Sequence, residues 1–494
     1  MQMSTAGGLR TNEPAGRWVL FTTSLGLTMA LLDSTAVNVA LPRIGADFDA
    51  GLAQLQWTAN AYMLTLAALI LLGGALGDRF GRRRIFVLGM TWFALASLLC
   101  ALAPSAGALI AARALQGVGG ALLTPGSLAL IQSSFHPDDR ARAVGMWSGL
   151  GGVGAAVGPF LGGWLVDGPG WRWVFLLNLP LAAAGIPVAL RHVPESRSDA
   201  PEQDFDVTGA VLGALSLGLL TYALIGVDWR AGVLGFLTGA WFVRTERRRA
   251  APMLPLSLFG SKQFTVINAV TLLVYAAFGG FFFLATLQLQ VVARYSALAA
   301  GTAMLPTTLL MLLLSGRAGL LGERLGPRIP LTTGSLLAAG GMLLMTRAGA
   351  GATYLTQVLP ALIVLGTGMV LLIAPLTATV LSSVDTSQAG IASGVNNAAA
   401  RAAGLIAVAA LPLLTGMKAR TYRSPQAFAA TFGQAMLWCA ALLTAAAVLS
   451  YTQLRRAGQA AEPARVPEPR VHCSITAPPL NPGPVTASLL DPTA

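Results

Sequence analysis

A ten-residue segment of the chain reads Gly74-Ala75-Leu76-Gly77-Asp78-Arg79-Phe80-Gly81-Arg82-Arg83, and a related segment, Gly319-Leu320-Leu321-Gly322-Glu323-Arg324-Leu325-Gly326-Pro327-Arg328, lies 245 residues further on. Glycines, an acid and arginines align at this constant offset. Each segment also follows a long apolar stretch, so the polar turn recurs at corresponding places. The repeat indicates two homologous halves related by parallel duplication, an organisation known among membrane proteins.

The composition assigns both halves to the membrane. Of the 494 residues, 55% are hydrophobic and only 11% are charged, whereas soluble globular proteins carry about 25% charged residues. The formal net charge of +12 would favour nucleic-acid binding in a soluble protein, but arginines retained in cytoplasmic loops explain it here. We therefore expect contact with a lipid bilayer and no nucleic-acid partner.

Candidate membrane-spanning helices follow from length, because a bilayer core of about 30 Å requires about 20 apolar residues per helix. The 14 candidates run over residues 18–40, 57–77, 85–103, 108–134, 143–165, 173–190, 208–226, 229–243, 264–290, 298–316, 331–346, 354–382, 390–415 and 428–451. The eighth is the weakest, because it is short and has Asp228 and Arg230 near its start. The predicted fold class is an all-α integral membrane protein with 14 transmembrane helices.

The offset between the repeats spans eight predicted helices rather than six, which indicates two extra helices between two six-helix bundles. The predicted units are a cytoplasmic N-terminus (1–16), an N-terminal bundle (17–191), an inserted hairpin with its flanking loops (192–263) and a C-terminal bundle (264–452). Residues 453–494 are rich in proline and lack apolar periodicity, so we expect a disordered cytoplasmic tail.

Basic residues set the predicted orientation. With the N-terminus inside, 22 of the 32 Lys and Arg residues lie on the cytoplasmic side and 8 on the other, as the positive-inside rule requires. Three of those 8 (Lys418, Arg420 and Arg423) share the loop before the last span, so the final hairpin is the least determined. We expect a multi-pass protein of the plasma membrane with both termini cytoplasmic. The excess of Arg over Lys is typical of a GC-rich bacterial genome.

Four motifs in the N-terminal half resemble those of the major facilitator superfamily. Residues 74–84 resemble its loop signature between the second and third helices, and residues 110–119 resemble its fourth-helix motif. Residues 32–42 resemble the first-helix signature of its fourteen-span group. The fifth-helix motif associated with antiporters is matched by Gly154, Gly158, Pro159, Gly162 and Gly163. The resemblance, looser in the C-terminal half, implies the major facilitator fold and a fourteen-helix drug:proton antiporter of the multidrug efflux type.

Asp33 is the one acidic residue predicted to lie well inside a span. A charged carboxylate is costly in a low-dielectric medium, so such a residue can bind and release a proton. Arg113 lies at a similar depth, about 10–12 Å from the outer face at about 1.5 Å per residue. We predict that Arg113 holds Asp33 ionised in one state and frees it for protonation in another. The alternatives are a structural acid, and an arginine that snorkels or binds backbone carbonyls.

Two further motifs carry predicted conformational roles. The resemblance implies a cytoplasmic latch, with positive-inside retention as the simpler alternative, at Asp78, Arg79, Gly81, Arg82, Glu323 and Arg324. On the fifth helix, Gly154, Gly158 and Gly162 are four residues apart and share one face, which permits close helix approach, and Pro159 favours a bend. Close packing alone is the alternative to control of opening toward one side, the role that the antiporter motif implies.

Polar residues in the spans are candidates for a substrate cavity. Arg401 lies near mid-depth beside Asn396 and Asn397 and would suit an anionic or carbonyl-bearing group, although it could equally bind helix carbonyls. The other candidates, which would suit an amphipathic cargo, are Asn38, Gln116, Tyr275 and Gln288.

These features favour a monomeric secondary exporter in which proton influx drives efflux of hydrophobic or amphipathic small molecules by alternating access. Transport of a polar metabolite, proton-coupled or facilitative, is the alternative, and a receptor on the same scaffold is a further one. The sequence contains no Walker motif, no histidine within a span and only three widely spaced cysteines, so we expect no enzyme activity, no cofactor and no metal site.

Overall fold

The computed structural model describes residues 8–197, 206–249, 252, 254–385, 388–417 and 424–454. Residues 1–7, and residues 455–494 of the predicted tail, lie outside the described residues. Within these ranges the chain is α-helical apart from loops, short 3-10 and π-helical turns, and one isolated bridge between Leu9 and Phe135. The predicted all-α fold class is therefore confirmed for the part of the chain that the structure describes.

The helices follow the chain in three groups. The first group consists of α1 (Pro14–Asp47), α2 (Leu52–Phe80), α3 (Arg82–Ala101), α4 (Ala106–Ser134), α5 (Pro137–Asp167), α6 (Arg172–Leu176) and α7 (Asn178–His192). The second is the pair α8 (Val207–Gly226) and α9 (Trp229–Arg248). The third consists of α10 (Lys262–Leu287), α11 (Ala297–Ala303), α12 (Leu305–Leu325), α13 (Arg328–Met345), α14 (Leu359–Ser382), α15 (Ala389–Leu414) and α17 (Pro425–Gln453).

Twelve helical segments in the described ranges are long and apolar enough to cross a membrane, and each coincides with one of the 14 predicted spans. The predicted spans 229–243 and 331–346 correspond to α9 and α13, which are long enough but not apolar enough to be counted among the twelve. The cause in α9 is its charged last turn, which carries Glu246, Arg247 and Arg248. Helix α13 has only 18 residues and begins with Arg328.

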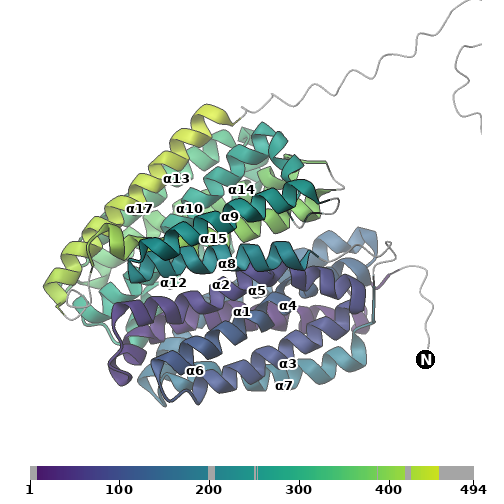
Figure 1. The fold of residues 1–494 in the computed structure, drawn as a ribbon, viewed down its shortest axis with the longest axis horizontal. Helices are drawn as coiled ribbons and strands as arrows, with labels where there is room; N and C mark the ends of the chain where they lie inside the picture. Colours follow the sequence, from purple (N-terminus) through teal and green to yellow (C-terminus); the bar gives the residue numbers. More distant parts are fainter. Residues whose placement is uncertain are drawn as a thin grey trace, which may run out of the picture.

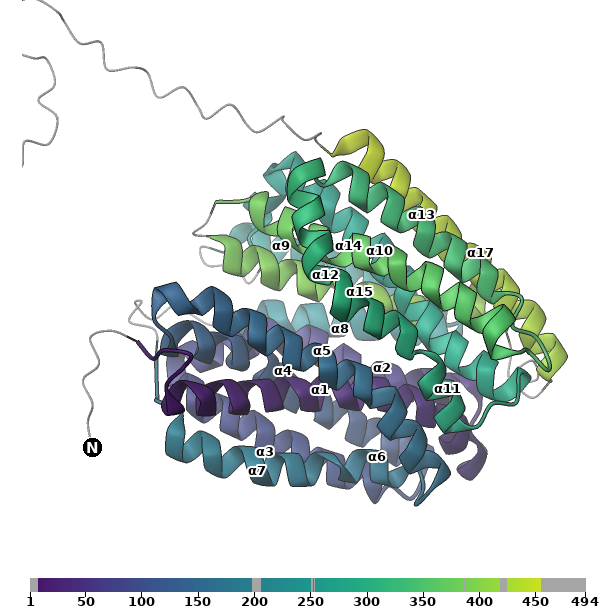
Figure 2. The ribbon, with the colours of Figure 1, turned by 180° about the vertical axis from the view of Figure 1, so that it is seen from behind.

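The first and third groups form two bundles that lie side by side, as Figures 1 and 2 show from opposite sides. In the first bundle α4 packs on α2 and α3, and α5 packs on α1. In the third group α13 packs between α14 and α17, and α10 packs on α15 and α17. Helix α8 contacts α9, α2 of one bundle and α15 of the other, so the α8–α9 pair lies against the junction of the bundles.

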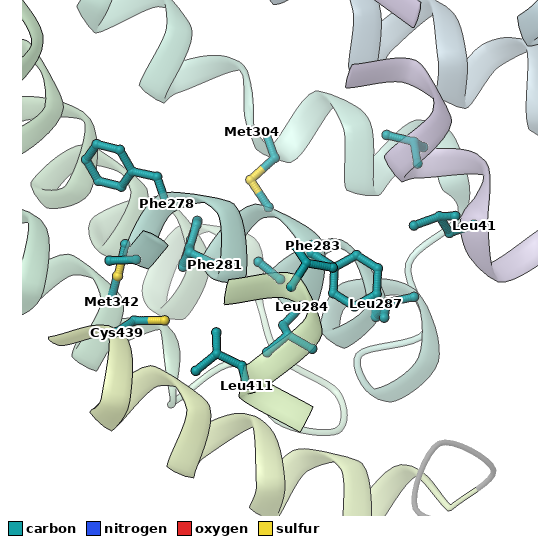
Figure 3. Close-up of a cluster of buried hydrophobic side chains, with 14 of the residues drawn as sticks. Leu41, Phe278, Phe281, Phe283, Leu284, Leu287, Met304, Met342, Leu411 and Cys439 are labelled. Carbon is teal, nitrogen blue, oxygen red and sulfur yellow. The ribbon is translucent and has the colours of Figure 1, made fainter. Parts of the chain in front are cut away.

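Helix α10 is at the centre of the packing in the second bundle. Figure 3 shows its buried side chains Phe278, Phe281, Phe283, Leu284 and Leu287 beside Met342 of α13, Leu411 of α15 and Cys439 of α17. Lipid tails are as apolar as these side chains, so the contacts stabilise the bundle through close packing rather than through removal from water.

Candidate functional site

A buried polar network surrounds Asp33 of α1. Nη1 of Arg113 lies 2.5 Å from Oδ2 of Asp33, and Nε2 of Gln116 donates to Oδ1 at 2.8 Å. Asn178 of α7 donates to the same Oδ1 at 3.1 Å. Ser97 of α3 accepts hydrogen bonds from Gln116 and Asn178 at 2.8 and 3.2 Å. Four helices, α1, α3, α4 and α7, therefore contribute side chains to one hydrogen-bond network around this carboxylate.

Arg113 is held on several sides besides Asp33. Its Nε donates to the carbonyl oxygen of Thr58 at 3.2 Å, and its guanidinium carbon lies 4.5 Å from the centroid of the Tyr62 ring. The side chains of Asp33 and Arg113 are only 0% and 2% exposed. The two residues placed at equal depth by the sequence thus form an ion pair, and the backbone bond proposed as the alternative for Arg113 forms as well. Removal of one partner from a buried pair of this kind strongly destabilises the folded protein, because the other charge is left buried without compensation.

A cavity of about 510 Å³ lies between the bundles beside this network. Its wall includes, among the predicted residues, Asn38, Arg113, Tyr275, Asn396, Asn397 and Arg401. Gln116 belongs instead to the Asp33 network, and Gln288 donates to the carbonyl oxygen of Ala348 at 2.7 Å. Neither glutamine is part of the cavity wall, because each amide is turned toward a buried partner within its own bundle.

The cavity extends toward one end of the molecule. Its wall reaches Leu381, in the last turn of α14, and Ser393, in the first turns of α15. We call this end the α14–α15 end. The opposite end, where α1 ends at Asp47 and α2 begins at Leu52, is the α1–α2 end.

Contacts between the bundles close the α1–α2 end. Gln56 of α2 donates to the carbonyl oxygen of Val408 in α15 at 2.7 Å, and Gln290 donates to the carbonyl oxygen of Val39 in α1 at 2.9 Å. The carboxylate of Asp167, at the end of α5, accepts hydrogen bonds from the backbone nitrogens of the first two residues of α11, at 3.2 and 2.8 Å. The sequence analysis identified none of these contacts.

The glycine face of α5 packs on α1. A Cβ on Gly154 would lie 2.6 Å from Cγ2 of Thr28, and one on Gly162 would lie 2.8 Å from Cα of Ala36. A Cβ on Gly158 would collide with Oγ1 of Thr35.

The same motif packs on the second bundle. A Cβ on Gly163 would lie 2.5 Å from the carbonyl oxygen of Ala297 in α11, and the carbonyl of Pro159 faces Gly301 of that helix. Because both neighbours approach so closely, only glycine fits between α1 and α11 at these positions.

The turn between α2 and α3 is held by ion pairs and hydrogen bonds to residues of its own bundle. Arg82 pairs with Asp78 at 2.7 Å, and Gly81 adopts a φ of 109°, a conformation that favours glycine. The turn docks on the segment after α7, where Glu195 accepts from the backbone nitrogen of Arg83 at 3.0 Å. The sequence analysis did not identify Glu195 as this partner.

The remaining latch candidates have fewer described contacts. The guanidinium of Arg79 lies over the ring of Phe80, 5.6 Å from its centroid. In the second copy of the motif, Arg324 is exposed, and the side chain of Glu323 lies outside the described part of the structure.

Comparisons with known proteins agree on one family. The protein-family model described as Major Facilitator Superfamily matches residues 23–409 of the sequence. The Tetracenomycin C resistance and export protein of Streptomyces glaucescens is 35% identical over 423 residues, 83% of this chain and 77% of the relative. Puromycin resistance protein pur8 of Streptomyces alboniger is 37% identical over 418 residues, 81% of this chain and 82% of the relative.

Solved structures of transporters share the fold. A POT family transporter in complex with 5-aminolevulinic acid aligns with a TM-score of 0.67 and 15% identity, over 89% of this chain and 95% of that one. A bacterial homolog of the human lysosomal transporter Spinster, inward-facing and unoccupied, aligns with a TM-score of 0.64 and 18% identity, over 89% and 97% of the two chains. At such identities the likeness concerns the fold alone.

Proposed function

Since the chain belongs to the Major Facilitator Superfamily and is a multi-pass membrane transporter, we propose that it is a proton-driven exporter of hydrophobic or amphipathic small molecules, such as drugs or antibiotics. The resistance and export functions in the names of its relatives support the proposal. The chain acts as a monomer with 14 transmembrane helices and both termini in the cytoplasm of a bacterium. Residues 17–191 and 264–452 are its two moving bundles, and residues 192–263 are the inserted hairpin.

One observation carries the proposal: Arg113 belongs both to the cavity wall and to the Asp33 network. A change at either place therefore acts on the same guanidinium. When Asp33 binds a proton, the charge that holds Arg113 is lost, and the guanidinium keeps only neutral partners such as Gln116 and the carbonyl of Thr58. Substrate in the cavity and the proton on Asp33 thus act on the position of Arg113 in turn.

The arrangement of the two ends supports alternating access. In the proposed orientation the α14–α15 end is cytoplasmic, so the cavity receives cargo from inside the cell while the contacts of Gln56, Gln290 and Asp167 close the outer end. Helix α5 transmits the change, because its glycines join α1, which carries Asp33, to α11 of the other bundle. The turn around Asp78 and Arg82, with its repeat at Glu323 and Arg324, serves as the cytoplasmic latch.

The driving force is the proton gradient. Each proton that moves inward contributes about 2.3 kcal/mol per 100 mV of membrane potential, plus the pH difference. The cavity wall also favours amphipathic cargo over a polar metabolite, because it is largely made of apolar side chains such as Phe278, Phe282 and Met369.

Transport by proteoliposomes under an imposed pH jump tests the proposal, with a panel of cationic, neutral and anionic aromatic compounds. We expect wild-type protein to move at least one compound against its gradient while protons flow the other way. Asp33→Asn should abolish the pH-driven flux, and Asp385→Asn, at an exposed loop acid, should leave it unchanged. Equal pH-driven flux and equal proton movement in Asp33→Asn and wild type would contradict the proton-site assignment.

A further inference from the structure

The wall of the central cavity carries an unbalanced positive charge. Among the described residues that line it, the charged ones are Arg113 and Arg401. Arg113 is balanced by Asp33, whose carboxylate is 0% exposed and lies behind the arginine rather than in the wall. Arg401 has no carboxylate on the wall to balance it, so the cavity as a whole is cationic.

Arg401 also lacks hydrogen-bond partners within the described part of the chain. Its Nε is buried and has no acceptor. The side-chain nitrogens of the neighbouring amides point to other partners, because Asn396 donates to Thr271 at 2.7 Å and Asn397 donates to the carbonyl oxygen of Ser393 at 3.0 Å, and among the described residues neither amide oxygen accepts a hydrogen bond from Arg401. An arginine stays charged in a protein, and a guanidinium removed from bulk water without an acceptor is costly. Arg401 is therefore a donor prepared for a group that enters the cavity.

The rest of the wall fits an aromatic body. Tyr275, Phe278, Phe282 and Phe283 of α10 line the cavity together with Arg401 of α15. A volume of about 510 Å³ lies within the range of pockets that hold drug-sized ligands. The wall thus presents an unpaired arginine close to a surface of aromatic rings.

We propose that this cavity selects aromatic compounds that carry an anionic group, a carboxylate or an acidic phenol, which pairs with Arg401. The guanidinium binds the anion through two parallel N–H groups, and the rings of α10 contact the apolar body. A cationic compound of the same shape meets the unbalanced charge of Arg401 and, among the described residues of the wall, no acid, so it is disfavoured. The inference deepens the proposed export function by naming its substrate class, and it rests on that function.

Equilibrium binding to purified full-length protein in detergent tests the charge preference without any proton gradient. Three probes share one ring system and differ in charge: anthracene-9-carboxylate, its methyl ester and 9-anthracenylmethylammonium. Binding is followed at neutral pH by the fluorescence of the probe. The variants are Arg401→Gln, Arg401→Lys and, as a matched control, Arg347→Gln, an exposed arginine outside the cavity. Thermal unfolding of each variant shows that it is folded.

We expect wild-type protein and Arg347→Gln to bind the carboxylate at least tenfold more tightly than the ester or the ammonium. Arg401→Gln should lose that preference while it keeps the affinity for the ester within about twofold, and Arg401→Lys should retain part of it. Absence of carboxylate binding, an equal or stronger affinity for the ammonium, or an unchanged preference in Arg401→Gln would overturn the inference. Failure of proton-driven export would appear only in the proteoliposome experiment, so the two failures are distinguishable.

Discussion

Each bundle places an arginine at the central cavity, and the two arginines differ in how their charge is balanced. In the first bundle Arg113 lies 2.5 Å from the carboxylate of Asp33 and is nearly inaccessible. In the second bundle Arg401 has no ion-pair or hydrogen-bond partner within the described residues. A paired charge can be released by a proton, whereas an unpaired one is neutralised by what enters the cavity. In the proposed mechanism the first bundle handles the proton and the second bundle recognises the cargo.

The largest expected difference between the two arginines is in how much their substitution changes the free energy of unfolding. Arg113→Gln leaves Asp33 buried without its counter-charge, and we expect a loss of about 3–5 kcal/mol in the free energy of unfolding. Arg401→Gln removes no described ion pair, so its effect should stay below about 1 kcal/mol. Denaturant titrations followed by tryptophan fluorescence measure both values.

A second variant sharpens the stability test. In the double variant Asp33→Asn with Arg113→Gln, both charges are absent, and part of the stability should return. The contrast between the bundles fails if Arg401→Gln destabilises the protein as much as Arg113→Gln does.

The glycine face of α5 connects the two bundles and supplies the next largest effect. Gly158→Val inserts a branched side chain against Thr35, and we expect a cost of about 1–3 kcal/mol from overpacking. Gly149→Val is the matched control, because it places the same side chain on the same helix in open space. Thermal unfolding compares the two, and equal effects would show that the contact with α1 is unimportant.

A carboxylate introduced beside Arg401 should give this arginine an ion-pair partner, as Asp33 is for Arg113. Asn397→Asp places a carboxylate four residues before Arg401 on α15, a spacing that favours an ion pair worth about 0.5 kcal/mol at an exposed position. We expect a slight gain in thermal stability and loss of the preference for anthracene-9-carboxylate. If the variant keeps that preference, Arg401 is not the group that binds the anion.

A buried acid outside the two bundles, Glu246 of α9, provides a contrast to Asp33. Burial, followed by a hydrogen bond with Asp206, raises the pKa of Glu246 to about 7, against about 4.3 for a free glutamate. The folded state thus binds a proton more tightly than the unfolded state, so this contribution to stability is present at acidic pH and is lost as the pH rises through 7.

The expected change in Tm from the titration of Glu246 is small. Raising the pH from about 5 to about 8 should lower Tm by about 1–2 °C, and Glu246→Gln should remove that component. The matched control Glu195→Gln should retain it. A wild-type Tm difference equal to that of Glu246→Gln would contradict the assignment.

The sequence allowed twelve of the fourteen predicted spans to be placed correctly and showed that an ion pair between Asp33 and Arg113 was possible, because both inferences depend on position along the helix axis. Apolar length gave the spans, and equal depth related Asp33 to Arg113. The spacing of Gly158 and Gly162 likewise predicted a close helix contact, which the structure contains on α1.

The partners that lie across helices could not be predicted in the same way. Asn178 reaches Asp33, and Ser97 reaches Asn178, only because α7 and α3 are rotated to face the network, and rotation depends on packing rather than on hydropathy. Asp167 was placed near a span end, but its bonds to α11 join residues about 130 positions apart. A lone asparagine in the apolar sixth span was the one available signal for Asn178.

The central claim, that Asp33 gains and loses a proton, can be measured without a substrate. Infrared difference spectroscopy of the protein in lipid, recorded between acidic and alkaline pH, resolves the stretching band of protonated carboxyl groups. We predict a band that appears as the pH falls in wild type and in Asp385→Asn, and that is absent in Asp33→Asn. A band of undiminished intensity in Asp33→Asn would contradict the account.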